Sequence, residues 1–148
     1  GGNVDVAVEI ADYILPEGLV VYLQDKNGDR EEYTSDASHH WDKPIVILVN
    51  GDSASAAEIV CGALKDYDRA TLVGTRTFGK GIVQQILPLG DGSGIKVTIA
   101  KYYTPNGTCI HGEGFEPDVE VEFDADLYVK DGTDNQLEKA IEVLKKGL

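Results

Sequence analysis

The chain has 148 residues, of which 42% are hydrophobic and 26% charged, and its formal net charge is −13 at pH 7. This length is enough for one hydrophobic core, so it predicts a single domain over residues 1–148. The negative charge argues against nucleic acids or an anionic membrane surface as partners, because their phosphates would repel the chain. No apolar run approaches the length of a membrane-spanning helix.

The N-terminal third predicts one helix and one hairpin. Residues 4–15 fit a helix better than a strand, because the helical apolar spacing is longer and ends at Pro16. Residues 19–24 and 30–34 are expected to pair as antiparallel strands on either side of the turn signal Asn27-Gly28.

A polar loop over 35–43 precedes the central elements. Residues 44–49 form a continuous β-branched run, which predicts a strand covered on both faces, as in an α/β sheet. A helix is expected from Ala54 to about Tyr67, and Ser55-x-x-Glu58 has the spacing of a capping box at its start.

The second half alternates short strands with glycine-rich connections and ends in a helix. The predicted elements are a strand at 70–73, a glycine-rich segment at 74–81, a hairpin of 82–89 with 95–104, a strand at 119–123 and a helix at 135–146.

Ser55 is the candidate nucleophile if the chain is an enzyme. A serine at a turn from strand to helix lies near free backbone N–H groups and the positive end of the helix dipole, which would stabilise an oxyanion. The same position also suits a serine that only caps the helix.

The histidines and cysteines do not have the spacing of known metal sites, and no histidine is clearly placed for a catalytic triad. The available metal ligands and triad histidines are His39, His40, His111, Cys61 and Cys109. Their spacing matches no paired-thiolate or helical His motif, so no metal site is expected. No histidine sits on an element that would clearly bring it to a serine. Cys61 lies among small helical residues and is expected to be a buried free thiol rather than half of a disulfide.

Lys80 is the candidate general base, which would make a Ser-Lys pair with Ser55. A lysine acts as a base near neutral pH only when it is shielded from water, and the neighbours Phe78 and Ile82 are compatible with such burial. An exposed lysine in a glycine-rich turn is the alternative interpretation.

Two segments together resemble the carboxy-terminal processing, or tail-specific, serine peptidase family. They are 49–59, which contains Ser53-Ala54-Ser55-Ala56-Ala57-Glu58, and 74–84, which contains Phe78-Gly79-Lys80-Gly81. The resemblance extends to Gly1-Gly2, to 101–107 and to 112–118, and so covers nearly the whole chain.

The resemblance implies an α/β core like those of ClpP and crotonase, with a mixed sheet flanked by helices, and a Ser-Lys peptidase without a cofactor or metal. The residues implied are Ser55 as nucleophile, Lys80 as base, Gln84 as helper of Lys80, and backbone N–H groups of Ala56 and of the Gly1-Gly2 turn as oxyanion donors. The role of Gln84 requires a helical turn over 80–84, because an extended strand would separate it from Lys80.

Two further residues receive secondary roles. Ser53 is the runner-up nucleophile and is expected to cap the helix. Asp66 matches an acidic family position, but it lies eleven residues after Ser55 on the helix, or about 16 Å along the axis, so a structural role is expected.

The resemblance also implies what the chain would do and what it would lack. Members cut protein substrates near their C-termini outside the cytoplasm and carry an export signal or anchor and a PDZ domain. We expect the C-terminal part of a catalytic core, from a bacterium, with an exposed sheet edge through which it could dimerise. The alternatives are a non-catalytic peptide or ligand binding module of the same superfamily, and a fragment inactive without its N-terminal part.

Overall fold

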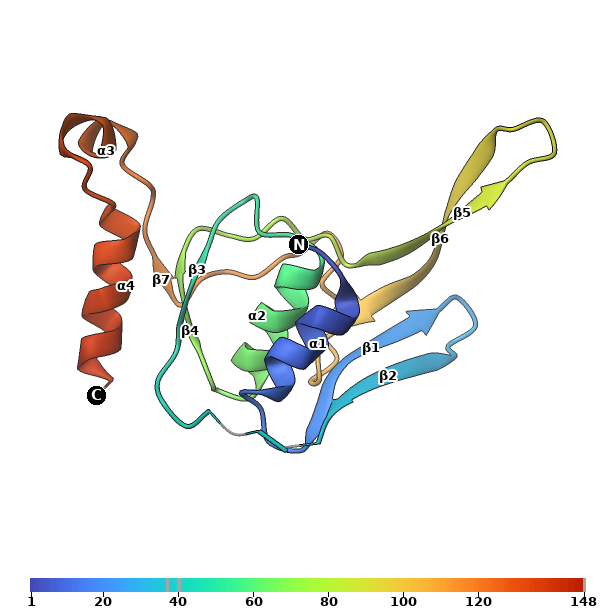
Figure 1. The fold of residues 1–148 in the computed structure, drawn as a ribbon, viewed down its shortest axis with the longest axis horizontal. Coiled ribbons are helices and arrows are strands. Elements are labelled where there is room, and N and C mark those ends of the chain that lie inside the picture. Colours follow the sequence, from blue (N-terminus) through green and yellow to red (C-terminus); the bar gives the residue numbers. More distant parts are fainter. Residues whose placement is uncertain (37, 40, 148) are drawn as a thin grey trace.

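The computed structural model describes residues 1–36, 38–39 and 41–147. Figure 1 shows α1 and α2 at the centre, the β5–β6 hairpin projecting at one end and α3 and α4 at the other. The elements are α1 (Val4–Asp12), β1 (Gly18–Asp25), β2 (Arg30–Ser35), β3 (Val46–Val49), α2 (Ala56–Asp66), β4 (Thr71–Gly74), β5 (Ile82–Pro88), β6 (Gly94–Tyr103), β7 (Val119–Glu120), α3 (Ala125–Asp131) and α4 (Asn135–Lys146).

The strands form two sheets, one antiparallel with the order β2-β1-β6-β5 and one parallel with the order β3-β4-β7. Helices α1 and α2 pack on each other and on β1, α2 also contacts β4, and α4 packs on β3 and β4. The predicted α/β class with helices flanking the sheets is therefore confirmed. The core between these layers includes Leu15, Val20, Ile59, Leu64, Leu72 and Ile110.

The strand β3 differs from its prediction. Its apolar run indicates burial on both faces, but β3 lies at the edge of the parallel sheet and Leu48 is 43% exposed. A run of apolar residues gives no information on what covers each face, so the sequence could not distinguish an edge strand from a central one.

Both predicted hairpins form. The carboxylate of Asp25 accepts hydrogen bonds from the backbone N–H groups of Asn27 and Asp29 and so fixes the first turn. In the second hairpin, β5 pairs with β6 from Ile82 to Pro88. Its projecting part leaves Ile86 and Ile95 exposed to solvent.

The C-terminal region contains a helix that the sequence did not predict. α3 is capped at its start by the Asp124 carboxylate, which accepts from Leu127 N–H, and ends at Gly132 in the left-handed conformation. β7 is shorter than the predicted strand at 119–123, whereas α4 matches its predicted bounds. On the apolar face of α4, which the sequence predicts to point inward and which carries Leu137, Ala140, Ile141 and Leu144, only Ala140 is buried.

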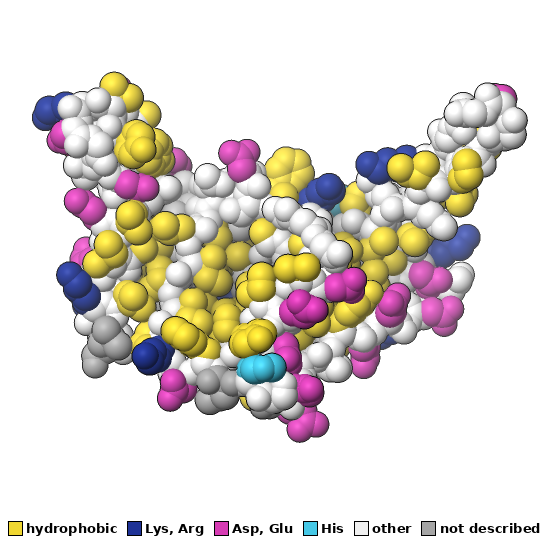
Figure 2. All heavy atoms as spheres, viewed as in Figure 1, with side chains coloured by type: hydrophobic (Ala, Val, Ile, Leu, Met, Phe, Trp, Pro, Cys, Tyr) yellow, Lys and Arg dark blue, Asp and Glu magenta, His cyan; other side chains and the backbone are white. Residues whose placement is uncertain are grey.

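An apolar groove lies between α1 and α4 and is lined by β3 and by the segment that precedes β3. Figure 2 shows hydrophobic side chains gathered over α1, the segment before β3 and α4. The groove has a volume of about 840 Å³ and includes Ile10 and Tyr13 from α1, Leu48 from β3, and Leu137 and Ile141 from α4. In the described part of the chain, no helix is both long and apolar enough to cross a bilayer.

Candidate active site

Ser55 stands at the strained turn between the parallel sheet and α2. It is the N-cap residue of α2 and has φ 60° and ψ −121°. A positive φ is costly for a residue with a Cβ and persists only where surrounding contacts enforce it. Such a turn from strand to helix presents the serine hydroxyl outward in hydrolases that use a nucleophilic serine.

The residues predicted to supply oxyanion donors lie beside Ser55. The N–H of Ala56, the first residue of α2, meets no hydrogen-bond acceptor in the described part of the chain. Gly1 packs directly on the Ala54–Ser55 peptide, since a Cβ on Gly1 would lie 2.3 Å from the carbonyl oxygen of Ala54. Gly2 adjoins this contact and has open space around it.

The sequence predicts that Ser53 caps α2, and this prediction is wrong. Ser53 does not cap α2; its hydroxyl accepts a hydrogen bond from the N–H of Asn50 at 3.1 Å, while Asp52 N–H donates to the Asn50 side chain. These bonds close the turn before the helix, and the helix begins two residues later than a cap at Ser53 requires. Ser55, the predicted nucleophile, therefore occupies the N-cap position of α2.

The carboxylate of Glu58 is fully buried and accepts four hydrogen bonds. Its Oε2 accepts from the N–H of Ser55 at 2.9 Å and of Lys80 at 2.8 Å. Its Oε1 accepts from the hydroxyl of Thr77 at 2.7 Å and from the N–H of Gly79 at 2.6 Å. The bond from Ser55 is half of the predicted capping box, but the other three bonds join α2 to a segment about twenty residues further along the chain.

Lys80 is thus brought to Ser55 through its backbone. Because the two nitrogens lie within 2.9 and 2.8 Å of the same oxygen, they are less than about 6 Å apart. The Lys80 side chain is exposed, in contrast to the shielding that a lysine base requires. The structure therefore brings the two residues together while leaving the lysine open to solvent.

The segment carrying Lys80 is fixed by close backbone packing. Thr77 exchanges two hydrogen bonds with Phe115, one through its N–H and one through its hydroxyl, which accepts from Phe115 N–H. A Cβ on Gly81 would lie 2.4 Å from the nitrogen of His111, so only glycine fits there without a backbone shift. The role of Thr77 has no signal in the sequence, because it depends on contacts between segments far apart in the chain.

Gln84 does not reach Lys80 through a helical turn. It lies in β5, and its side-chain amide donates to the hydroxyl of Thr98 across the hairpin at 3.4 Å. The coiled conformation that its helper role requires is absent from this segment.

Asp66 has a structural contact at the far end of α2. Its carboxylate accepts from Asn106 N–H at 2.7 Å and so fastens the turn after β6 to the helix. This contact agrees with the structural role expected from its position.

The histidines and cysteines lie in other environments. His39 stacks on Tyr13 with ring centroids 4.2 Å apart, at the groove, and His40 lies outside the described residues. His111 is exposed beside Gly81. Cys61 is a buried free thiol, as predicted, and burial together with the negative charge of Glu58 raises its pKa to about 11.

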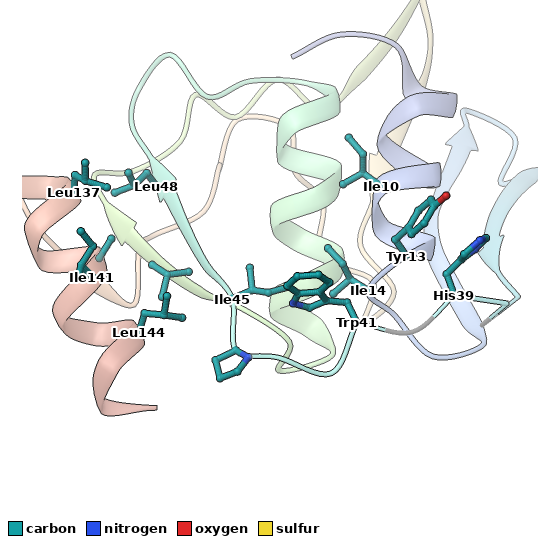
Figure 3. A pocket seen from close by; sticks show the side chains of 13 residues that line it. Ile10, Tyr13, Ile14, His39, Trp41, Ile45, Leu48, Leu137, Ile141 and Leu144 are labelled. Atoms are coloured by element: carbon teal, nitrogen blue, oxygen red, sulfur yellow. The ribbon is translucent and has the colours of Figure 1, made fainter. Parts of the chain in front are cut away.

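The apolar groove is separate from this site. Figure 3 shows side chains from α1, from the segment before β3 and from α4 pointing toward one another across it. Its lining includes Trp41, Ile45 and Leu144 but neither Ser55 nor Lys80. The groove therefore contributes no group to the candidate active site.

The carboxyl-terminal-processing protease of Synechocystis sp. is 48% identical over 122 residues, which are 82% of this chain and 29% of that protein. The carboxy-terminal processing protease CtpB of Bacillus subtilis is 39% identical over 122 residues, 82% of this chain and 25% of that protein. The chain therefore spans less than a third of the length of these relatives.

Solved structures give the same relationship. The photosystem II D1 C-terminal processing protease superposes with a TM-score of 0.78 and 41% identity over 82% of this chain and 32% of that one. The tricorn protease has a TM-score of 0.59 at 24% identity, over 99% of this chain and 14% of its own, and shares the fold. The family model described as peptidase family S41 matches residues 1–121, and the chain therefore belongs to this peptidase family.

Proposed function

We propose that the chain is part of the catalytic core of a serine endopeptidase that cuts protein substrates near their C-termini through a Ser55–Lys80 dyad. The observation that carries the proposal is the strained Ser55 at the start of α2 with the Lys80 backbone less than about 6 Å away. Relatives named as carboxyl-terminal-processing proteases support the substrate class.

In the first half of the reaction, neutral Lys80 removes the proton from the Ser55 hydroxyl as its oxygen attacks the carbonyl carbon of the scissile peptide. The carbonyl oxygen becomes an oxyanion, which accepts hydrogen bonds from Ala56 N–H and from an N–H of the Gly1-Gly2 turn. The C–N bond then breaks, the departing amine takes the proton from Lys80, and an ester to Ser55 remains.

In the second half, Lys80 takes a proton from water, whose oxygen attacks the ester carbonyl. The ester bond breaks, Ser55 regains a proton from Lys80 and the acid product leaves. Gln84 assists by orienting Lys80, which requires a change in the start of β5, because Gln84 now bonds to Thr98.

The dyad is tested with Ser55→Ala and Lys80→Ala in the protein that carries this chain. Each substitution should abolish cleavage of an unfolded protein substrate, and Ser55→Ala should also abolish labelling by a fluorophosphonate. Lys26→Ala, at the exposed first hairpin turn, is the matched control and should leave cleavage unchanged. Substantial cleavage by either site variant would refute the assignment.

The wider setting of the reaction is part of the same proposal. The substrate binds as an added strand beside the site, and the whole protein works outside the cytoplasm with a PDZ domain that captures the substrate C-terminus. The open edge of β3 and the adjoining apolar groove support pairing of two copies of this chain. Sedimentation that stays monomeric at all concentrations would exclude such pairing.

A further inference from the structure

We propose that Glu58 is a positioning residue that sets the separation between the nucleophile and the base, with Thr77 orienting it. This inference rests on the proposed Ser55–Lys80 dyad. It assigns Glu58 a task beyond capping α2, because three of its four hydrogen bonds leave the helix.

The four bonds divide between the two oxygens in a way that links both halves of the dyad. Oε2 receives one N–H from Ser55 and one from Lys80, so a single atom fixes both backbones. Oε1 receives Gly79 N–H and the Thr77 hydroxyl, which hold the residues before Lys80 against α2. A shift of the carboxylate would therefore move the nucleophile and the base relative to each other.

The hydrogen-bond pattern identifies Glu58 as an acceptor only. An ionised carboxylate offers about four lone-pair directions, and all four partners are donors. The Thr77 hydroxyl accepts from Phe115 N–H, so its own proton is directed at Glu58. With four donors directed at its two oxygens, the Glu58 carboxylate is placed to act through position.

No lysine, arginine or histidine of the described residues forms an ion pair with Glu58. Its charge is balanced by backbone N–H groups and a hydroxyl, which are stronger when they donate to an ionised acceptor. Such bonds from Ser55 N–H also help to hold the positive φ of the nucleophile. The same carboxylate thus maintains both the strained turn and the approach of Lys80.

The test uses variants that keep the shape and change the hydrogen bonds. Glu58→Gln replaces one acceptor oxygen with an NH₂ group, which faces two donors. Thr77→Val removes the hydroxyl at nearly constant volume, whereas Thr77→Ser keeps it. Glu17→Gln, an exposed position, is the control for loss of one negative charge.

The first measurement is amide hydrogen exchange in the protein that carries this chain. Glu58→Gln should speed exchange at the amides of Ser55, Gly79 and Lys80 by about 10-fold or more, while the amides of β4 stay protected. Thr77→Val should have a smaller effect in the same direction. Unchanged exchange at all three amides would overturn the proposal whatever the activity.

The second measurement is the rate of Ser55 acylation by a fluorophosphonate, and of substrate cleavage, per folded molecule. Glu58→Gln should lower the acylation rate and kcat by about 100-fold or more with little change in KM, because a misplacement of about 1 Å has effects of this size. Thr77→Ser should restore most of the rate lost in Thr77→Val. A purely structural role would reduce the folded fraction and leave the rate per folded molecule unchanged, which would overturn the proposal.

Different results would contradict the Ser55–Lys80 dyad and the positioning role of Glu58. Acylation that persists in Ser55→Ala, or is absent from the unmodified protein, would contradict the dyad. Loss of acylation in Ser55→Ala together with full rates in Glu58→Gln would contradict only the role of Glu58.

Discussion

The conformation of Ser55 makes a quantitative prediction about stability. Ser55→Gly and Ser55→Ala both remove the hydroxyl, but only glycine adopts φ 60° and ψ −121° without steric cost. The glycine variant should therefore be the more stable of the two, although glycine loses more conformational freedom than alanine when the chain folds.

Two opposing contributions determine the expected difference in the free energy of unfolding between Ser55→Gly and Ser55→Ala. Relief of a strained backbone conformation contributes about 1–3 kcal/mol. The greater freedom of glycine in the unfolded chain opposes this by about 0.4–1 kcal/mol. The net gain is about 1 kcal/mol for Ser55→Gly over Ser55→Ala, which corresponds to a rise in Tm of roughly 2–4 °C for a chain of this size.

Urea denaturation followed by circular dichroism measures this difference directly, with Asp68→Gly against Asp68→Ala as the matched pair. Asp68 also has a positive φ, 53°, but it is exposed and lies just after the end of α2. This pair therefore measures how much glycine at a positive φ raises the free energy of unfolding away from the candidate site. If Ser55→Gly were no more stable than Ser55→Ala, the backbone of Ser55 would not be strained. The inference that surrounding contacts hold this turn in an unfavourable conformation would then be wrong.

Three further predictions concern the segment beside Lys80 and the two thiols. Gly81→Ala should destabilise the fold by about 2 kcal/mol in urea denaturation, because the new Cβ meets the backbone of residue 111, whereas Gly90→Ala, with open space around it, should change stability by less than about 0.5 kcal/mol. In thiol titration, Cys109 should react in the folded protein and Cys61 only after unfolding, since burial raises the pKa of Cys61 to about 11. The contribution of Cys61 to stability is complete below the ordinary pKa of a thiol, 9.0, and should decrease as pH rises from there toward 11, which urea titrations across this range would detect.

Local patterns in the sequence are enough to predict most elements of the fold. The Asn27-Gly28 turn, the β5–β6 hairpin and α4 depend on neighbouring residues, and their predictions are confirmed. α3 escapes prediction because only seven residues form it and no buried face marks its period. The exposed edge of β3 escapes it because burial depends on partners elsewhere in space.

In the candidate site, too, contacts between neighbouring residues can be predicted from the sequence, whereas contacts between distant segments cannot. Ser55 and Glu58 lie three residues apart, so a capping pattern makes both visible in the sequence alone. The bonds from Glu58 to Thr77, Gly79 and Lys80 cross about twenty residues of chain and leave no local pattern. The family resemblance pairs Ser55 with Lys80, but it does not indicate what holds them together.

The exposure of Lys80 determines when the proposed dyad can work. A lysine removes a proton from serine only when water no longer stabilises its charged form, and Glu58 fixes the Lys80 backbone without covering the side chain. The cover must therefore come from a bound substrate or from further polypeptide lying over Gly81 and the start of β5. Binding would then activate the base as well as position the peptide, and a free site would remain inactive toward water and small esters. Labelling of Ser55 that is slow in the free protein and accelerates when a peptide ending before the scissile bond binds beside the site, so that the Ser55 hydroxyl stays open to the label, is the behaviour that this arrangement requires. Equal labelling in both states would contradict it.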